Sequence, residues 1–366
     1  MRANGTILVT GGTGTLGREL VRRLAEESSR PPIVVLSRGG RATGAAFPFN
    51  VRVARGDLRA GPGLGFTAME REELTGQVTG ILHCAAETRF TLPLEEARAV
   101  NVDGTRSLLE FAAGCRSLER VGCFSTVYVA GLRTGWFSED DVDDGGAGFA
   151  NTYERSKSEM EGEVRARMPD LPIAVYRLST LIGDSKTGAV SGLNAFHHAL
   201  RLLYQGLAPM VPGDPEHRVD VVATDYVADA ACWLFGQRFE AGRTYHLCSG
   251  PGESSTLAGL INAAMEAFHL FRADWRRRHI EKPAIVDLPT YELFVRSVEE
   301  TGNEVLLAAT RAVQSFAVQL AYPKTFDSTL TQAALEGSGL RPPPVLDVLP
   351  RVIRACLETN WRPTST

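Results

Sequence analysis

The sequence lacks the features that would place the chain on nucleic acid or in a membrane. Its 366 residues include 39 Lys and Arg against 43 Asp and Glu, a net charge of -4, so the basic excess that binds phosphate backbones is missing. The best candidate for a membrane-spanning helix, residues 305–321, contains Arg311. The polar N-terminal residues do not have the regions of a secretory signal. We therefore expect a cytoplasmic protein without a nucleic-acid partner or a transmembrane segment.

Cysteine and histidine lack the spacings of metal or disulfide sites. The six cysteines form no CxxC pair and the seven histidines no HxxxH. His197 and His198 are adjacent but have no carboxylate near them in the sequence. Most cysteines lie in apolar runs, where an unpaired cysteine behaves as a small hydrophobe. The sequence predicts no metal site.

Short apolar runs alternate with helical patterns through the first half of the chain. This alternation is typical of a parallel sheet with helices on both faces, and the runs are nearly all apolar, as strands covered on both faces require. We predict an α/β fold, a Rossmann-type doubly wound parallel sheet with a smaller, mostly helical C-terminal substrate lobe. The expected strands are 6–10, 33–37, 51–54, 80–84, 121–125 and 173–178, and the expected helices are 17–27, 95–113 and 152–168.

A glycine-rich turn stands between the first expected strand and the first expected helix. This is the context in which such a turn binds a dinucleotide. One glycine makes the tight turn, another lets the backbone approach a pyrophosphate, and a third lets helix and strand pack closely, while the helix N-terminus offers free N–H groups to the phosphates. The predicted cofactor contacts here are Gly11, Thr13, Gly14, Thr15, Leu16 and Gly17.

The end of the second strand lacks the acidic residue that binds the ribose diol of NAD. Ser37 and Arg38 stand there, with Arg41 close behind. An arginine at this place pairs with a 2′-phosphate and stacks on adenine. The alternative is a solvated surface arginine. We therefore predict NADPH as the cofactor, with Arg38 as a ligand.

Tyr153 and Lys157 stand four residues apart, on one face of an expected helix. The ordinary pKa of tyrosine is about 10, so the pKa of this phenol must fall by about 3 units for it to act as an acid near neutrality. The lysine ammonium and the charge of a nicotinamide favour the phenolate, and the lysine can also hold the nicotinamide ribose. A hydroxyl at the end of strand 121–125 can bond a substrate carbonyl oxygen, and both Ser125 and Thr126 are candidates.

Together these motifs resemble the extended branch of the short-chain dehydrogenase/reductase superfamily over about residues 6–250. Residues 10–17 are similar to its TGxxGxxG turn, 83–86 to the HxAA strand end, 101–105 to the NVxGT helix and 125–131 to the STxxVxG strand. In that alignment Thr126 takes the place of the active-site Ser/Thr, which completes a catalytic set with Tyr153 and Lys157. The resemblance also implies that the cofactor contacts Asp57, Leu58, Ala85, Ala86, Asn101, Tyr153 and Lys157.

Finer features resemble one part of that branch. Residues 83–90, 151–157, 176–188 and 211–214 are similar to fatty acyl-CoA reductases and to terminal thioester-reductase domains of carboxylic acid reductases and peptide synthetases. Leu178 departs from the proline that the extended branch often has at that place. The resemblance implies NADPH-dependent reduction of an acyl thioester, carried by coenzyme A or a carrier protein, to an aldehyde. It leaves open a second reduction to the alcohol.

Other activities use the same three residues. A ketone or alcohol dehydrogenase of the extended branch needs the same set, so only the substrate lobe separates it. A sugar-nucleotide epimerase or dehydratase is disfavoured, because dehydratases carry Asp-Glu after the catalytic threonine whereas Val127 and Tyr128 follow here, and because Arg38 disfavours NAD. A non-enzymatic NADP sensor commonly lacks the tyrosine or the lysine, and both are present.

The C-terminal part carries the substrate predictions. We assign residues 1–184 plus about 218–250 to the NADP-binding domain, and about 185–217 plus 251–366 to the substrate-binding lobe. In this second half we expect helices over 194–205 and 224–235, strands over 219–222 and 244–249 that return to the sheet, and mainly helix over 257–321. The apolar stretch 291–321 either lines a channel for an acyl chain or packs the lobe. A basic run around Trp275 is either a solvated helix end or a dock for coenzyme A phosphates or an acidic carrier protein; it consists of Arg272, Arg276, Arg277, Arg278, His279 and Lys282.

Overall fold

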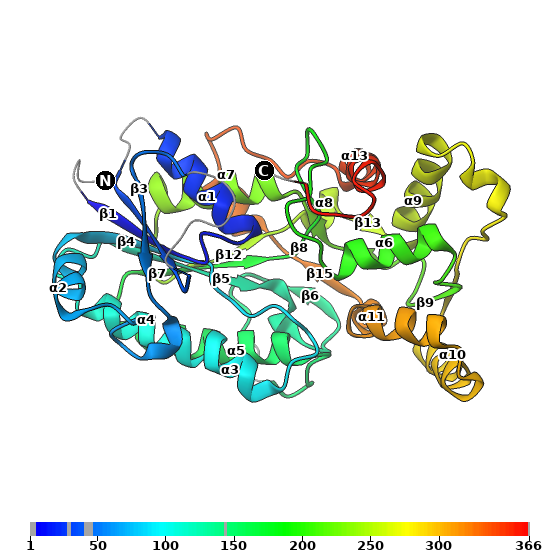
Figure 1. The fold of residues 1–366 in the computed structure, drawn as a ribbon, viewed down its shortest axis with the longest axis horizontal. Coiled ribbons are helices and arrows are strands. Elements are labelled where there is room, and N and C mark those ends of the chain that lie inside the picture. The colour runs from blue at the N-terminus through cyan, green and yellow to red at the C-terminus, as the bar shows by residue number, and fades with distance from the viewer. Residues whose placement is uncertain (1–4, 28–30, 40–46, 143–144, 365–366) are drawn as a thin grey trace.

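Seven parallel strands form one sheet in a computed structural model that describes residues 5–27, 31–39, 47–142 and 145–364 (Figure 1). The strand order is β12-β7-β5-β4-β1-β2-β3. The order of connection reverses between β1 and β4, and ligands bind at the carboxyl ends of the strands at such a switch point. The strands are β1 (Thr6–Thr10), β2 (Ile33–Ser37), β3 (Val51–Arg55), β4 (Val78–His83), β5 (Arg120–Thr126), β7 (Ile173–Leu178) and β12 (Thr244–Leu247). The predicted fold class is confirmed.

Helices cover both faces of this sheet, which explains why β1, β4 and β5 are buried along their whole length. Two helices, α1 (Thr15–Glu26) and α7 (Thr224–Gly236), lie on one face (Figure 1). The helices on the other face are α2 (Ala68–Gln77), α3 (Leu94–Asn101), α4 (Asp103–Ala113) and α5 (Thr152–Arg167).

The expected helix 95–113 is in fact two helices, α3 and α4, with a break at Val102. The Thr105 hydroxyl donates to the Asn101 carbonyl at 2.7 Å. A side chain that bonds a helix carbonyl in this way competes with the backbone ladder. The break therefore reflects a side-chain hydrogen bond that the apolar periodicity of the segment does not reveal.

The expectation that strand 219–222 returns to the main sheet is wrong. Its two halves, β10 (Arg218–Val219) and β11 (Val221–Val222), pair instead with β13 (Ser255–Thr256) and β8 (Thr180–Leu181). Asp220, between them, is buried, and its carboxylate accepts the N–H groups of Ser249 and Gly250 at 3.0 and 2.8 Å. This polar anchor separates the two halves. The strand expected over 244–249 does return to the sheet, as β12.

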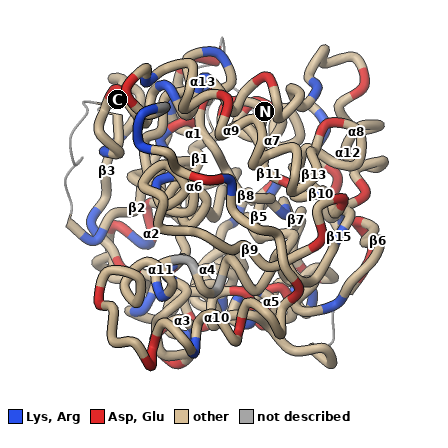
Figure 2. Tube along the Cα trace, turned by 90° about the vertical axis from the view of Figure 1, so that its right-hand side faces the viewer, with Lys and Arg blue, Asp and Glu red and all other residues tan. Residues whose placement is uncertain are grey.

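The C-terminal helices gather at the end of the molecule toward which the central strands run (Figure 1). One hydrophobic core continues from α1 and α7 into this lobe. Figure 2, seen from the lobe end, shows basic and acidic residues interspersed. The remaining helices are α6 (Ala195–Gln205), α8 (Gly250–Glu253), α9 (Leu257–Phe271), α10 (Leu288–Thr301), α11 (Glu304–Leu320), α12 (Thr329–Ala334) and α13 (Val345–Glu358), with η1 (Leu58–Ala60), η2 (Val127–Ala130) and η3 (Trp275–Arg278). The remaining strands form the pairs β6 (Gly135–Phe137) with β15 (Lys324–Phe326) and β9 (Met210–Pro212) with β14 (Ala284–Val286).

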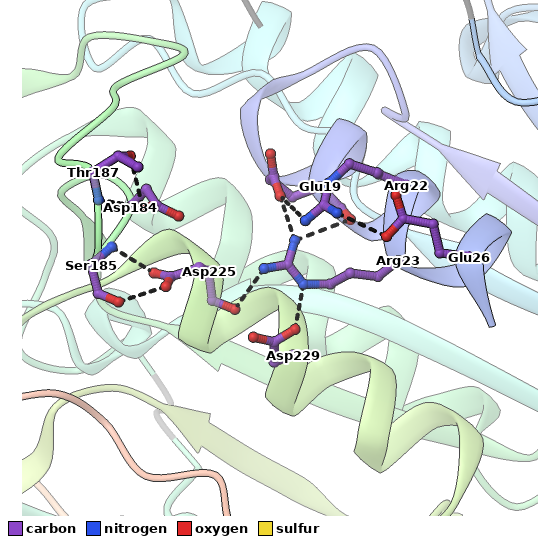
Figure 3. A network of polar contacts seen from close by, with 9 residues as sticks. All are labelled: Glu19, Arg22, Arg23, Glu26, Asp184, Ser185, Thr187, Asp225 and Asp229. Atoms are coloured by element: carbon purple, nitrogen blue, oxygen red, sulfur yellow. Dashed lines mark hydrogen bonds and ion pairs between the residues drawn. The ribbon is translucent and has the colours of Figure 1, made fainter.

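A polar network ties α1 to α7 (Figure 3). Arg23 on α1 donates from Nε to Asp229 Oδ1 at 2.5 Å, and its guanidinium also bonds the Glu19 carboxylate and the Asp225 carbonyl. The Asp225 carboxylate accepts the backbone N–H and the hydroxyl of Ser185 at 2.9 and 2.6 Å. The helix that follows the glycine turn is thereby linked to the loop after β8.

Within the described ranges, no helix has both the length and the apolarity needed to cross a bilayer. In the same residues, no group of three or more His, Cys, Asp or Glu side chains is arranged to hold a metal ion. The six cysteines are unpaired.

Candidate active site

The turn between β1 and α1 has the shape that a bound pyrophosphate requires. Gly11 has φ of +69°, and a Cβ there would lie 2.5 Å from the Ala85 nitrogen, while a Cβ at Gly17 would collide with the Gly11 carbonyl oxygen. Gly14 begins α1 without a side-chain cap, and the first turn holds no acidic residue. The N–H groups at the start of α1 are therefore open to an anion. These residues fit the phosphates of a dinucleotide.

The other predicted residues of this turn differ in exposure. Thr13 and Thr15 are partly exposed beside Gly14, whereas the Leu16 side chain is buried in the core. Leu16 therefore faces a ligand only through its backbone.

A chain of buried hydrogen bonds lies under the turn. Thr10 Oγ1 is 2.7 Å from His83 Nδ1, and His83 Nε2 is 2.8 Å from Thr105 Oγ1. Burial lowers the pKa of His83 to about 3, so the ring is neutral near pH 7. The Thr10 hydroxyl also accepts the Ala85 N–H at 3.3 Å. His83 thus joins β1, β4 and α4 and sets the position of Ala85, with Ala86 next to it, at the switch point.

Asn101 is buried and fully engaged. Its amide donates to Ser156 Oγ at 2.8 Å and to the Glu87 carbonyl at 3.0 Å, and its oxygen accepts the Glu87 N–H at 2.8 Å. Asn101 therefore links α5, which carries Tyr153 and Lys157, to the loop that follows β4.

The expected adenine side is rich in arginine. Arg38 is exposed at the end of β2. The pKa of the Asp57 carboxyl group is lowered mainly by the hydrogen bond from Arg59, whose NH2 lies 2.7 Å from Asp57 Oδ2. The charge of Arg38 lowers this pKa further, so Arg38 lies near Asp57. Arg55, also exposed, stands opposite Ser37 in the β2–β3 register. Sequence reasoning missed Arg55 and Arg59, although both flank the segment that it singled out.

Two further predicted positions complete this side. Leu58 is buried, and a Cβ at Gly104 would lie 3.1 Å from the Leu58 Cβ, so glycine lets α4 approach η1. Arg41 lies outside the described residues.

The three predicted catalytic residues come from β5 and α5. Lys157 is 3% exposed, and its Nζ donates to the Phe124 carbonyl at 2.7 Å. The Thr126 hydroxyl donates to the Leu178 carbonyl at 3.2 Å, and it lies close enough to the Tyr153 hydroxyl to act on the pKa of that phenol. The structure thus brings Thr126 and Tyr153 together, with Lys157 one helical turn further along α5.

Burial dominates the protonation of this set. Burial lowers the pKa of Lys157 to about 8. Burial raises the pKa of Tyr153, as does the carboxylate of Glu154, and the Thr126 hydroxyl opposes this only in part. The lowering of the Tyr153 pKa by Lys157 and a bound nicotinamide stays a prediction, and it would have to overcome the cost of desolvating a phenolate.

Ser125 is the second candidate for the hydroxyl. It is 3% exposed, and its side chain influences the pKa of Glu161, four residues beyond Lys157 on α5. Of these two hydroxyls, it is the Thr126 hydroxyl that acts on the pKa of Tyr153. The geometry favours Thr126 over Ser125.

A second polar chain beside Tyr153 was not foreseen. Gln319 on α11 donates from Nε2 to Glu154 Oε2 at 2.6 Å, and Lys324 on β15 donates to Gln319 Oε1 at 2.8 Å. All three side chains are buried. Burial raises the pKa of Glu154 to about 7 and lowers that of Lys324 to about 8. These hydrogen bonds tie α11 and β15 to α5, the helix that carries Tyr153 and Lys157.

An apolar cavity of about 700 Å³, partly open to solvent, lies among α6, β9, α9, α10 and α11. The stretch 291–321 contributes four of its lining residues, as the channel alternative expects. They are Tyr291, Phe316, Ala317 and Leu320. The cavity is also lined by Phe196, Leu200 and Leu203 of α6 and by Leu257, Leu260 and Ile261 of α9.

The basic run is built around a buried anchor. Trp275 is 1% exposed, and its indole N–H donates to the Tyr204 carbonyl at 2.8 Å. Arg272 is partly buried and bonds the Leu357 carbonyl at 2.5 Å. The side chains of Arg277, Arg278, His279 and Lys282 are exposed, and the Arg276 side chain lies outside the described residues.

Comparison with known proteins agrees with the family resemblance. A family model described as male sterility protein matches residues 9–231. A linear gramicidin synthase of Brevibacillus parabrevis is 25% identical over 291 residues, which are 73% of this chain but 6% of that protein. Fatty acyl-CoA reductase wat of Drosophila melanogaster is 22% identical over 272 residues, 61% of this chain and 52% of that protein. The chain thus spans a small part of the synthase and about half of the reductase.

Solved structures show the same fold. The terminal R domain of the myxalamid PKS-NRPS pathway matches with a TM-score of 0.79 and 24% identity, over 99% of this chain and 93% of that one. A thiolation-reductase di-domain of an archaeal non-ribosomal peptide synthetase matches with a TM-score of 0.68 and 17% identity, over 98% and 76%. With a family match over more than half of its length, the chain belongs to the male sterility protein family, which consists of NAD(P)-binding oxidoreductases with the extended short-chain dehydrogenase/reductase fold.

Proposed function

We propose that the protein is an NADPH-dependent reductase that converts an acyl thioester, carried by coenzyme A or by a carrier protein, into an aldehyde. One observation carries this proposal. The Thr126–Tyr153 hydroxyl pair stands where β5 ends, and α11 connects it, through Gln319 and Glu154, to an apolar cavity of about 700 Å³. A hydroxyl pair linked in this way to an apolar cavity suits a carbonyl group on an apolar chain.

The proposal assigns the cofactor to the following residues. The glycine turn and the N-terminus of α1 would hold the pyrophosphate, Arg38 the 2′-phosphate, and Lys157 the nicotinamide ribose. When bound there, NADPH supplies a hydride. The uncapped start of α1 and the arginines around Asp57 support this assignment.

The chain's own groups act on the carbonyl oxygen. The Thr126 hydroxyl, turned from the Leu178 carbonyl, and the Tyr153 hydroxyl donate hydrogen bonds to this oxygen and stabilise the negative charge that develops on it. Tyr153 then transfers its proton to the oxygen. Loss of the thiol leaves the aldehyde, so each turnover consumes one hydride and one proton and releases one aldehyde and one free thiol.

Lys157 contributes by position and charge. Its Nζ is held by the Phe124 carbonyl at 2.7 Å, one helical turn from Tyr153. In the buried site, its positive charge favours the Tyr153 phenolate that remains after proton transfer. The acyl chain is then bound by the substrate lobe.

The carrier of the thioester is part of the proposal. The similarity to a thiolation-reductase di-domain supports a substrate bound to a carrier protein. Carrier proteins of acidic surface would be attracted by the exposed basic residues Arg277, Arg278 and Lys282, an attraction that weakens with salt. We further propose residues 1–184 with about 218–250 as the cofactor domain and about 185–217 with 251–366 as the substrate lobe.

The test is NADPH consumption with acyl-CoAs of increasing length, with the matching aldehydes and a set of ketones in parallel, and with the products identified by mass. Thioester reduction yields an aldehyde, and an alcohol among the products would reveal a second reduction. The Tyr153→Phe variant is the control. Consumption with ketones, but with no thioester of any length, would replace this proposal by a carbonyl reductase.

A further inference from the structure

A second cavity of about 420 Å³ adjoins the apolar one. Its lining mixes apolar side chains with polar ones, and we call it the polar cavity. The two cavities share four lining residues, so they lie side by side. The shared residues are Val219, Leu257, Phe316 and Leu320.

Two lining residues of the second cavity are bonded to the region of Thr126 and Tyr153. Tyr128 donates its backbone N–H to the Thr126 hydroxyl at 3.2 Å. Gln319 bonds Glu154, the neighbour of Tyr153. We therefore take the second cavity as the one that receives the part of an acyl chain nearest to a carbonyl held by Thr126 and Tyr153.

Lys324 is a hydrogen-bond donor in the lining of this cavity. Lys324 Nζ is 2.8 Å from Gln319 Oε1 and 2.9 Å from the Tyr322 carbonyl, which engages two of its three N–H groups. Asp220, the one acidic residue in the lining, already accepts two backbone N–H groups through its carboxylate. His217 and Arg218 complete the polar lining. A cavity of this kind pairs with an acceptor oxygen.

We infer that the acyl group reduced at this site carries a hydrogen-bond-accepting oxygen, such as an amide carbonyl or a hydroxyl, close to the thioester, and an apolar tail beyond it. Lys324 is the specificity-determining residue that binds this oxygen. The inference rests on the proposed thioester reduction. Its physical basis is that a plain alkyl chain in the polar cavity would desolvate the third Lys324 N–H without replacing its hydrogen bond, whereas an acceptor oxygen replaces it.

The test compares two thioesters whose acyl chains have the same number of backbone atoms, decanoyl-CoA and N-heptanoylglycyl-CoA. For the wild-type protein we expect kcat/KM to be about tenfold or more higher for the amide, the size of one hydrogen bond to a charged group. 3-Hydroxydecanoyl-CoA provides a second acceptor and should also exceed decanoyl-CoA.

Two lysine variants separate specificity from general damage. In Lys324→Met the ratio of kcat/KM between amide and alkyl substrates should fall towards one, whatever the absolute rates. Lys186→Met, at an exposed lysine outside both cavities, should keep the wild-type ratio. NADPH binding and thermal unfolding establish that each variant is folded. Tyr128→Phe, a smaller change in the same lining, is measured alongside, and we expect it to reduce the ratio of kcat/KM between amide and alkyl substrates.

The outcomes are distinct. Reduction of both substrates at equal efficiency, or an unchanged ratio in folded Lys324→Met, overturns the inference and leaves the proposed function intact. Turnover of ketones without turnover of any thioester overturns the proposed function and this inference with it.

Discussion

Replacing Lys157 by methionine should make the protein more stable at neutral pH while nearly abolishing turnover. Lys157 is 3% exposed and carries its charge in the core. Burial lowers its pKa to about 8 from the ordinary 10.5. At 1.36 kcal/mol for each pH unit, the buried charge costs about 3 kcal/mol of folding free energy.

Part of that gain is lost with the ammonium group. The Nζ hydrogen bond to the Phe124 carbonyl, 2.7 Å long, contributes about 1–2 kcal/mol. Methionine has a similar length and fits the buried path of the side chain. We therefore expect Lys157→Met to increase the free energy of unfolding by about 1–2 kcal/mol at pH 7.

The pH dependence distinguishes this cause from better packing. Below pH 8 the folded protein keeps the buried proton and bears the full cost. Between about 8 and 10.5 the folded state releases the proton while the unfolded state still binds it, so wild-type stability rises relative to the variant. The advantage of Lys157→Met should shrink over this window.

Urea unfolding at pH 7 and at pH 9.5, followed by tryptophan fluorescence, measures the difference, and NADPH consumption measures the loss of activity. Lys186→Met is the control, because Lys186 is exposed and its removal should leave stability unchanged within about 0.5 kcal/mol. A Lys157→Met protein that is less stable than the wild type at pH 7, or equally favoured at both pH values, would refute the reasoning.

Three further predictions concern the site. Tyr153→Phe keeps the ring but removes the proton donor, so turnover should fall by about 10²–10⁴ with little change in cofactor binding; near-full turnover would remove Tyr153 from the mechanism. Arg38→Ala should weaken NADPH binding by about 1–3 kcal/mol and leave NADH nearly unchanged in fluorescence titrations, with exposed Arg71→Ala as the control; equal losses for both cofactors would contradict the 2′-phosphate assignment. Ala317→Phe fills part of the apolar cavity, so kcat/KM should stop rising at a shorter acyl length, and each excluded methylene should cost up to about 0.8 kcal/mol of binding free energy. Ala308→Phe, on the exposed side of α11, should leave the length profile unchanged. An identical profile for both variants would exclude this cavity as the acyl site.

Local sequence was sufficient for the parts of the protein whose geometry depends on neighbours in the chain. The glycine turn is defined by contacts within a few residues and with the adjacent strand end, and Gly17 meets Gly11 as the motif requires. The spacing of Tyr153 and Lys157 follows from helical periodicity alone. Apolar strands covered on both faces identify a parallel sheet before any packing is known. The fold class and the candidate catalytic set were therefore accessible from the sequence.

Only the tertiary structure decided the features that depend on distant residues. Gln319 meets Glu154 across 165 positions of the chain, and no local pattern announces that contact. The carboxylate of Asp220 splits an expected strand because it finds backbone N–H groups near Gly250, nearly thirty residues away. The pKa of Tyr153 is raised mainly by burial, which is a property of the whole packed site. Periodicity and spacing describe what one segment does, whereas cavities, buried charges and long-range hydrogen bonds exist only once several segments pack together.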